Sequence, residues 1–255
     1  MQSGGKPKHG KRARSPQDPA LDRRIRQIMD QYGLERAEAA QVARGRADLN
    51  EVIARLAMNV EVDSLMRRHD LSRALATQIA RKQANLEQVL NKRRMQAHVE
   101  ANHARSLLDP SSTAKEPIFL VLHGGRQAEG RVLAVHQYEF EFQENGKDPE
   151  TIHKLKVMYG CLAVDRKKVR RLVRADEVQK AASTGPIEKP QDRYTCSNQR
   201  LFGYLRDKKS VDVTLLEGDR FTGEVEWIGR FEIGLRLKGN IDVVIFRHAL
   251  AHVGD

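Results

Sequence analysis

The chain contains 255 residues and carries a net charge of +11 at pH 7, because its 45 Lys and Arg residues outnumber its 34 Asp and Glu residues. This length exceeds one small domain and fits two or three modest ones. The charge favours polyanionic partners, with nucleic acid ahead of an acidic membrane surface. No apolar run approaches the roughly 20 residues of a membrane-spanning helix, and the first residues lack the apolar core of a secretory signal. We therefore expect a cytoplasmic protein without membrane attachment.

The sequence offers no pattern typical of catalysis or of metal binding. Its two cysteines, Cys161 and Cys196, form neither a CxxC pair nor a metal-ligand pattern, and we interpret them as free thiols in a reducing compartment. There is no phosphate-binding loop, no HExxH motif and no Ser-His-Asp arrangement with supporting glycines. We therefore predict a binding protein that is not an enzyme and uses no metal or cofactor.

The first twenty residues are rich in Gly, Lys, Arg, Ser and Pro and contain almost nothing that a core could bury. Such a composition is typical of disordered segments. We expect a disordered basic arm over residues 1–20. Two roles stay open for it: a solubilising tail, or a non-specific phosphate contact that weakens with salt.

Residues 21–108 contain an internal repeat with a period of 37 residues, which places Leu34 on Leu71. Periods of this length are typical of stacked helices, so we predict a helical repeat domain of two three-helix units and one more helix. Gly33 suits the left-handed position after a helix, and Asp48 suits the cap before the third helix. The residues expected to face a small core in the first unit are Leu34, Ala39, Val42, Leu49, Val52 and Ile53.

A three-helix unit with a tight turn is also similar to a helix-turn-helix. Its candidate recognition helices would cover residues 48–56 and 85–93, of which only the second is clearly basic. The additional helix is expected over residues 96–108. Nothing in these segments specifies contacts to bases, so two partners stay open for the helical domain: another protein, or duplex DNA.

From Ile118 the apolar periodicity changes from that of helices to that of strands. We predict five strands between residues 118 and 164 and five more between residues 211 and 253. A linker over residues 175–197 and a short helix over residues 198–206 separate the two groups.

The two groups of strands align with each other. At an offset of 93 residues, Gly130 falls on Gly223 and Tyr138 falls on Phe231. A glycine inside a strand permits the sharp bend that a small barrel requires. We therefore interpret the two groups as two copies of one small barrel.

Two segments, Gly218–Val225 (GDRFTGEV) and Phe246–Ala249 (FRHA), resemble the signature segments of Hfq-type Sm-like RNA-binding domains. The resemblance implies an α+β chain in which the helical domain precedes two small five-stranded Sm-like β-barrels. The first, at residues 116–174, is degenerate, and the second, at residues 198–255, is of the Hfq type. The resemblance also implies a homo-oligomeric ring that forms through the edges of the fourth and fifth strands, with three tandem chains as one arrangement.

The resemblance also implies where RNA would bind. In this family an aromatic side chain stacks on a base, and a Lys-His pair after the fourth strand contacts base and phosphate. Phe231 matches the stacking residue, and Arg247 and His248 take the positions of the pair. Tyr138 is the corresponding aromatic residue of the first copy. The remaining RNA-binding residues implied by the resemblance are Gln199 in the preceding helix, and Arg206, Lys208 and Lys209, which resemble a basic rim.

The first copy departs from the family pattern. We expect a longer loop after Phe142, and with that loop skipped residues 157–159 match residues 244–246. Gly160–Cys161 then occupies the positions of Arg247–His248, so the cation and the imidazole are lost. We therefore expect the first copy to have a structural role.

Together these features predict an RNA-binding protein that captures single-stranded, U-containing RNA by stacking and electrostatic attraction. RNA-chaperone activity and post-transcriptional regulation are implied by the resemblance alone. Two alternatives stay open. One is a DNA-associated regulator that uses the helical repeats, and the other is a ring-forming scaffold for protein interactions.

Overall fold

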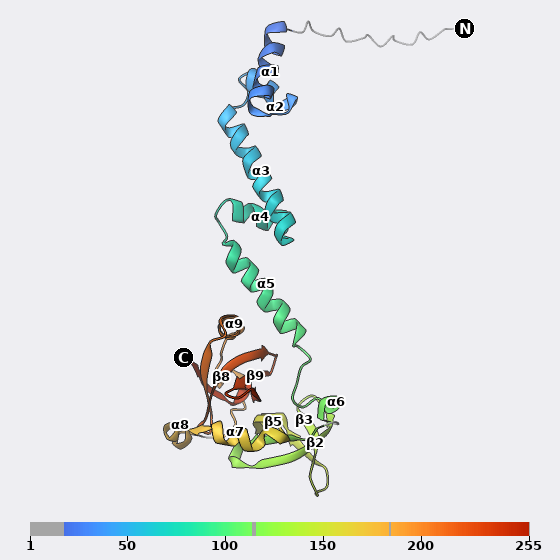
Figure 1. Ribbon diagram of the computed structural model, residues 1–255, viewed down its shortest axis with the longest axis vertical. Helices are drawn as coiled ribbons and strands as arrows, with labels where there is room; N and C mark the ends of the chain where they lie inside the picture. Colours follow the sequence, from blue (N-terminus) through green and yellow to red (C-terminus); the bar gives the residue numbers. More distant parts are fainter. Residues whose placement is uncertain (1–17, 114–115, 184, 255) are drawn as a thin grey trace, which may run out of the picture. The chain divides into compact units, whose positions relative to one another are not determined.

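The computed structural model describes residues 18–113, 116–183 and 185–254 (Figure 1). These residues form an α+β protein, with helices first and antiparallel strands from Ile118 onward. Most of the expected basic arm precedes residue 18 and lies outside the described residues. The chain divides into two compact units that meet at residue 86, and each is described by itself.

The first unit contains the helical repeat. Its helices are α1 (Pro19–Tyr32), α2 (Arg36–Ala43), α3 (Leu49–His69) and α4 (Arg73–Ala80). α2 and α4 begin and end 37 residues apart, as the repeat predicts. Gly33 and Asp70 end α1 and α3 in the left-handed conformation, with φ of 65° and 49°, and Asp48 caps α3 by accepting from two backbone N–H groups. α3 is longer than predicted, because it is both the third helix of the first repeat and the first helix of the second.

The first repeat closes around a small apolar core. Its buried residues are Ile25, Leu34, Ala39, Ala43 and Val52. Ile53 was predicted to belong to this core, but it is 36% exposed. Val52 lies on one stripe of α3 with the partly buried Leu49 and Leu56, whereas Ile53 lies at the edge of that stripe.

The second unit begins within α5 (Leu86–Ala101). This one helix replaces the two predicted over residues 85–93 and 96–108. After Ala101 the chain leaves the helix and packs onto the sheet, where Leu108 is buried in an apolar cluster. The other helices of this unit are α6 (Pro110–Thr113), α7 (Arg166–Leu172), α8 (Glu177–Ala181) and α9 (Asn198–Asp207).

All strands of the second unit form one antiparallel sheet. The first group is β1 (Ile118–Leu122), β2 (Gln127–Val135), β3 (Glu139–Glu144), β4 (Glu150–His153) and β5 (Val157–Leu162), with the 3-10 turn η2 (Lys154–Lys156) before β5. The second group is β7 (Ser210–Leu215), β8 (Asp219–Ile228), β9 (Glu232–Leu237), β10 (Ile241–Phe246) and β11 (Leu250–Gly254), with the 3-10 turn η5 (Arg247–Ala249) before β11. We call these groups the first and the second segment.

The prediction of two small five-stranded β-barrels was wrong. The strand order is β11-β7-β8-β9-β10-β5-β1-β2-β3-β4, and the short strand β6 (Arg174–Ala175) pairs with β8, which makes one 11-stranded open sheet. Within the described residues, β10 does not pair with β11 of its own segment. It pairs instead with β5 of the first segment, in the register Val244↔Gly160 and Ile245↔Tyr159. One open edge of each segment is thereby paired with an edge of the other, and we call this junction the seam.

The two segments have the same strand order and the same irregularities. Each has a bulge at an equivalent place, between Val132 and Ala134 in β2 and between Val225 and Trp227 in β8. These positions are again 93 residues apart, so the offset that aligns the two groups of strands also relates their irregularities. The glycine of each long strand is required by close packing, since a Cβ atom on Gly223 would lie 2.6 Å from a backbone oxygen of β9.

The structure corrects the alignment in the second half of the segments. The offset of 93 residues continues through the fourth strands, without the longer loop expected in the first segment. Lys154 therefore stands at the position of Arg247 and Leu155 at that of His248, and the match to Gly160–Cys161 was wrong. β5 and β10 are both mostly buried and apolar, and this similarity favoured the wrong match.

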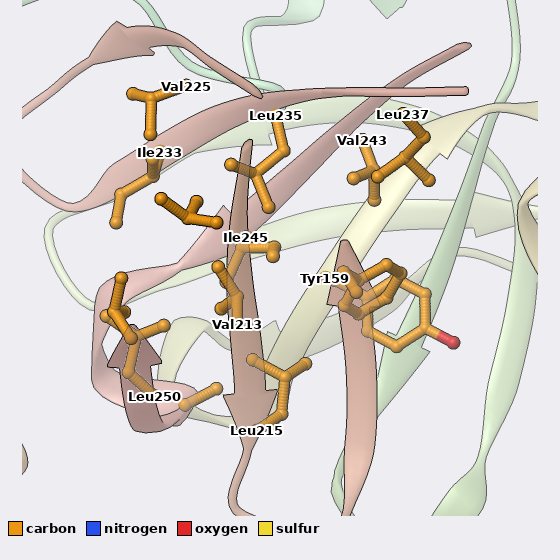
Figure 2. Close-up of a cluster of buried hydrophobic side chains, with 14 of the residues drawn as sticks. Tyr159, Val213, Leu215, Val225, Ile233, Leu235, Leu237, Val243, Ile245 and Leu250 are labelled. Carbon is orange, nitrogen blue, oxygen red and sulfur yellow. The ribbon is translucent and has the colours of Figure 1, made fainter. Parts of the chain in front are cut away.

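At the seam each segment contributes aromatic side chains to the core of the other. Tyr159 of β5 belongs to the apolar core of the second segment, where its ring meets that of Phe221 edge to face at 4.8 Å between centroids. Figure 2 shows Tyr159 among aliphatic side chains from the strands of the second segment. In the other direction, Phe246 of β10 belongs to the core of the first segment. Each segment therefore completes the core of the other.

Candidate nucleic-acid interface

A cavity of about 890 Å³ lies where the two segments meet. Its lining includes the turns between β2 and β3 and between β8 and β9, the 3-10 turns η2 and η5, the loop after α5, and part of the linker. This volume lies in the upper part of the range of ligand-binding sites. Five cationic side chains line its walls: Arg105, Lys154, Arg193, Arg230 and Arg247.

Two aromatic rings line this cavity from equivalent places. Tyr138 and Phe231 are each 64% exposed, so neither ring serves the core. Their backbones are held by equivalent hydrogen bonds: Lys154 N donates to Tyr138 O at 2.8 Å, and Arg247 N donates to Phe231 O at 2.9 Å. The guanidinium of Arg230 lies 4.9 Å from the centre of the Phe231 ring. The structure thus presents two exposed π faces on a defined backbone.

Arg247 lines the cavity, but its guanidinium is already bonded. Nη1 donates to Asn198 Oδ1 at 2.8 Å and to Gly229 O at 3.2 Å, and Nη2 donates to Cys196 O at 2.7 Å. Burial lowers the pKa of Arg247. These hydrogen bonds join the start of α9, the turn before Phe231 and the linker. Arg247 therefore holds the segments around the cavity together.

His248 is half-buried and neutral. Its Nε2 lies 2.8 Å from Val157 O, to which it donates in the tautomer that this contact requires. Burial lowers the pKa of His248 to about 4, although the bond to Val157 opposes the shift. The other ring nitrogen, Nδ1, carries no proton, so it can only accept a hydrogen bond from a ligand.

Lys154 is the cation of the first segment that the sequence alignment missed. Its Nζ donates to His136 O at 2.5 Å and to Gln137 O at 3.2 Å. Burial lowers its pKa, while the nearby carboxylate of Glu232 opposes that shift. A constant offset of 93 residues, applied without a loop, would have identified it.

Glu232 was also not identified from the sequence. This residue directly follows the exposed Phe231, and nothing in the sequence indicated that its side chain is buried. It is 5% exposed and accepts from Ser106 Oγ at 2.5 Å and from Leu107 N at 2.8 Å. Burial raises its pKa. Glu232 therefore fixes the loop after α5 against one wall of the cavity, which no sequence pattern indicated.

The other residues implied by the resemblance lie elsewhere on the second segment. Gln199 is exposed in the first turn of α9, and its neighbour Asn198 is the one that contacts Arg247. At the far end of α9, Arg206 pairs with Asp207 at 2.7 Å. Lys208 lines a separate groove of about 770 Å³. The residues that the structure does not bring to the cavity lining are Gln199, Arg206, Lys208 and Lys209.

No protein-family model, curated protein or solved structure matches this chain. Across the residues that the structure describes, no helix combines the length and the apolar character that crossing a bilayer demands. The duplicated segments, the cavity at their seam and the charge of the chain are therefore the observations from which a function can be argued.

Proposed function

We propose that this chain is an RNA-binding protein, not an enzyme, and that it captures single-stranded RNA in the cavity at the seam. The observation that carries the proposal is the ring of Phe231, which is largely exposed and lines a cavity with five cationic side chains. Stacking on an aromatic face stabilises an unpaired base by about 1–3 kcal/mol. A base paired in a duplex cannot offer its face in this way, so the site favours single strands.

Electrostatic attraction supports the same proposal. The net charge of +11 draws polyanions to the protein, and the affinity for them falls as salt rises. A preference for U-containing RNA, RNA-chaperone activity and post-transcriptional regulation follow from the resemblance to Hfq-type proteins, and they belong to the proposal on that ground. A cytoplasmic location belongs to it because Cys161 and Cys196 are free thiols, as in a reducing compartment.

We further propose that the chain forms a homo-oligomer through the two ends of its sheet. β4 and β11 are the outermost strands, and they are the counterparts of β10 and β5, which pair at the seam. Transferring the seam register by 93 residues places Thr151 opposite Val253 and Ile152 opposite His252 of a second copy. Such head-to-tail pairing repeats, so it closes into a ring when the rotation allows, with three chains as the arrangement that the resemblance implies.

The test is competition binding of labelled oligo-U RNA and duplex DNA to the full chain at two salt concentrations. We expect oligo-U to bind more tightly, and Phe231→Ala to weaken it roughly tenfold through lost stacking. Tyr32→Ala is the matched control, because Tyr32 is an aromatic residue of the helical unit and is 41% exposed. Tighter binding of duplex DNA that Phe231→Ala leaves unchanged would favour a DNA-associated regulator, and binding of neither would favour a protein scaffold.

A further inference from the structure

We propose that the first segment supplies a second base-binding half-site in the same cavity, formed by Tyr138 and Lys154, so that one chain binds two consecutive unpaired nucleotides there. This inference rests on the proposed function and deepens it. It replaces the expectation that the first segment has only a structural role.

The backbone frames of the two half-sites are equivalent bond for bond. His136 N donates to Glu139 O at 2.9 Å in the first segment, and Gly229 N donates to Glu232 O at 2.9 Å in the second. The residue 93 positions after Lys154 is Arg247, and both donate from their backbone N–H to the carbonyl of the exposed aromatic residue. The first segment therefore keeps the turn that presents a ring to a ligand.

Both rings face one shared cavity. Tyr138 and Phe231 are exposed to the same extent, 64%, and both line the cavity of about 890 Å³ at the seam. A single exposed aromatic residue requires no functional explanation. Two at equivalent positions, one from each segment, lie where neighbouring bases of one strand could stack on them.

The first half-site also retains polar groups that can reach a base or a phosphate. Lys154 has three N–H donors, and two of them are directed to His136 O and Gln137 O, which leaves one for a ligand. The hydroxyl of Tyr138 accepts from Gln137 Nε2 at 2.9 Å, and its own O–H can still donate. In the second segment the corresponding cation, Arg247, directs three of its five N–H donors to protein acceptors, so both cations support the turn and keep donor capacity for a ligand.

The test compares two competitors, uridine monophosphate and the dinucleotide UpU, for their ability to displace labelled oligo-U from the full chain. We expect the wild-type chain to bind UpU at least tenfold more tightly than the mononucleotide. Tyr138→Ala should weaken UpU about tenfold and remove its advantage, since one stacking surface is lost. Tyr138→Phe keeps the ring and should weaken UpU only severalfold, and Tyr32→Ala should change nothing.

The two proposals fail in different ways. If Phe231→Ala weakens UpU and Tyr138→Ala does not, the second half-site is overturned and the proposed function stands. If neither variant weakens UpU or oligo-U while both remain folded by circular dichroism, the proposed function itself is overturned. Weakening by both variants, with loss of the dinucleotide advantage in each, supports both proposals.

Discussion

Arg247 and Lys154 hold the same point of two duplicated turns. Arg247 Nη1 donates to Gly229 O at 3.2 Å, and Lys154 Nζ donates to His136 O at 2.5 Å. Each accepting carbonyl belongs to the residue two positions before the exposed aromatic ring. The two cations differ in chemistry but support the turns in the same way, which indicates that orienting the ring is part of their function.

Substitution of Arg247 should therefore distinguish two roles of this residue, holding the turn before Phe231 and contacting a phosphate. Arg247→Lys keeps the charge but replaces a planar guanidinium, whose two terminal nitrogens reach separate acceptors, by a single ammonium nitrogen, and we expect it to lower oligo-U affinity about fivefold. The slope of log affinity against log salt should stay unchanged. Arg230→Met is the comparison, because Arg230 is exposed over the Phe231 ring, and loss of one phosphate contact there should reduce the slope by about 0.7. Wild-type binding by Arg247→Lys would assign Arg247 to the ligand instead.

The stability of the second unit should depend on His248 between about pH 6.5 and pH 4. The folded-state pKa of His248 is lowered to about 4 by burial, below the value of about 6.5 in an unfolded chain. A lowered histidine pKa means that the unfolded state binds the proton more readily, so the stabilisation is complete above pH 6.5 and is lost as the pH falls. From pH 7 to pH 5 the loss should be about 2 kcal/mol.

Urea unfolding of the wild-type chain and of His248→Gln at both pH values measures this effect. Only the difference between the two proteins is informative, because other groups titrate as well. The pKa of Glu232 is raised by burial. Its contribution therefore has the opposite sign, and it increases the free energy of unfolding as the pH falls. An identical pH dependence in the two proteins would contradict the prediction.

The glycines of the long strands should tolerate no side chain. A Cβ atom on Gly130 would overlap Gln143 O, and one on Gly223 would lie 2.6 Å from Arg236 O. We expect Gly223→Ala to destabilise the second unit by more than about 2 kcal/mol, because backbone atoms have to move. A Cβ atom on Gly203 in α9 would meet nothing within 4 Å beyond its own helical turn, so Gly203→Ala should stabilise by up to about 1 kcal/mol. Urea denaturation compares the two variants.

Self-association should depend on the outer edges of the sheet. Light scattering of the full chain should give a molar mass of three chains, or of another closed number. Thr151→Lys places a charge on the exposed edge strand β4 and should shift the protein to single chains. Gln127→Lys adds the same charge on β2, which is already paired on both sides, and it should leave the mass unchanged. A monomeric wild-type chain would refute the proposed oligomer.

The sequence predicted the elements of this protein better than their connections. The period of 37 residues located the short helices because capping and turn residues recur with it, as Gly33 and Asp70 do. The offset of 93 residues located Tyr138 and Phe231 because a bent glycine strand precedes both. Local backbone requirements of this kind restrict which residues can occupy a position, so they can be recognised in the sequence.

The strand pairing at the seam and the hydrogen bonds of Arg247 could not be recognised in the sequence. An apolar strand such as β5 can pair with its own segment or with another one, and its composition does not reveal which. The bonds of Arg247 go to one side chain and two carbonyls, which two separate stretches of chain contribute. Any residue can supply a carbonyl, so these partners become visible only when the chain is folded.

The exchange of Tyr159 and Phe246 across the seam has a consequence for how the duplicated halves can change over time. A substitution that changes the core of one segment also changes the packing around an aromatic ring that the other segment contributes. The halves should therefore lose structure in a single step on heating, and differences that accumulate between them should fall mainly at the mouth of the shared cavity, where Tyr138 already differs from Phe231.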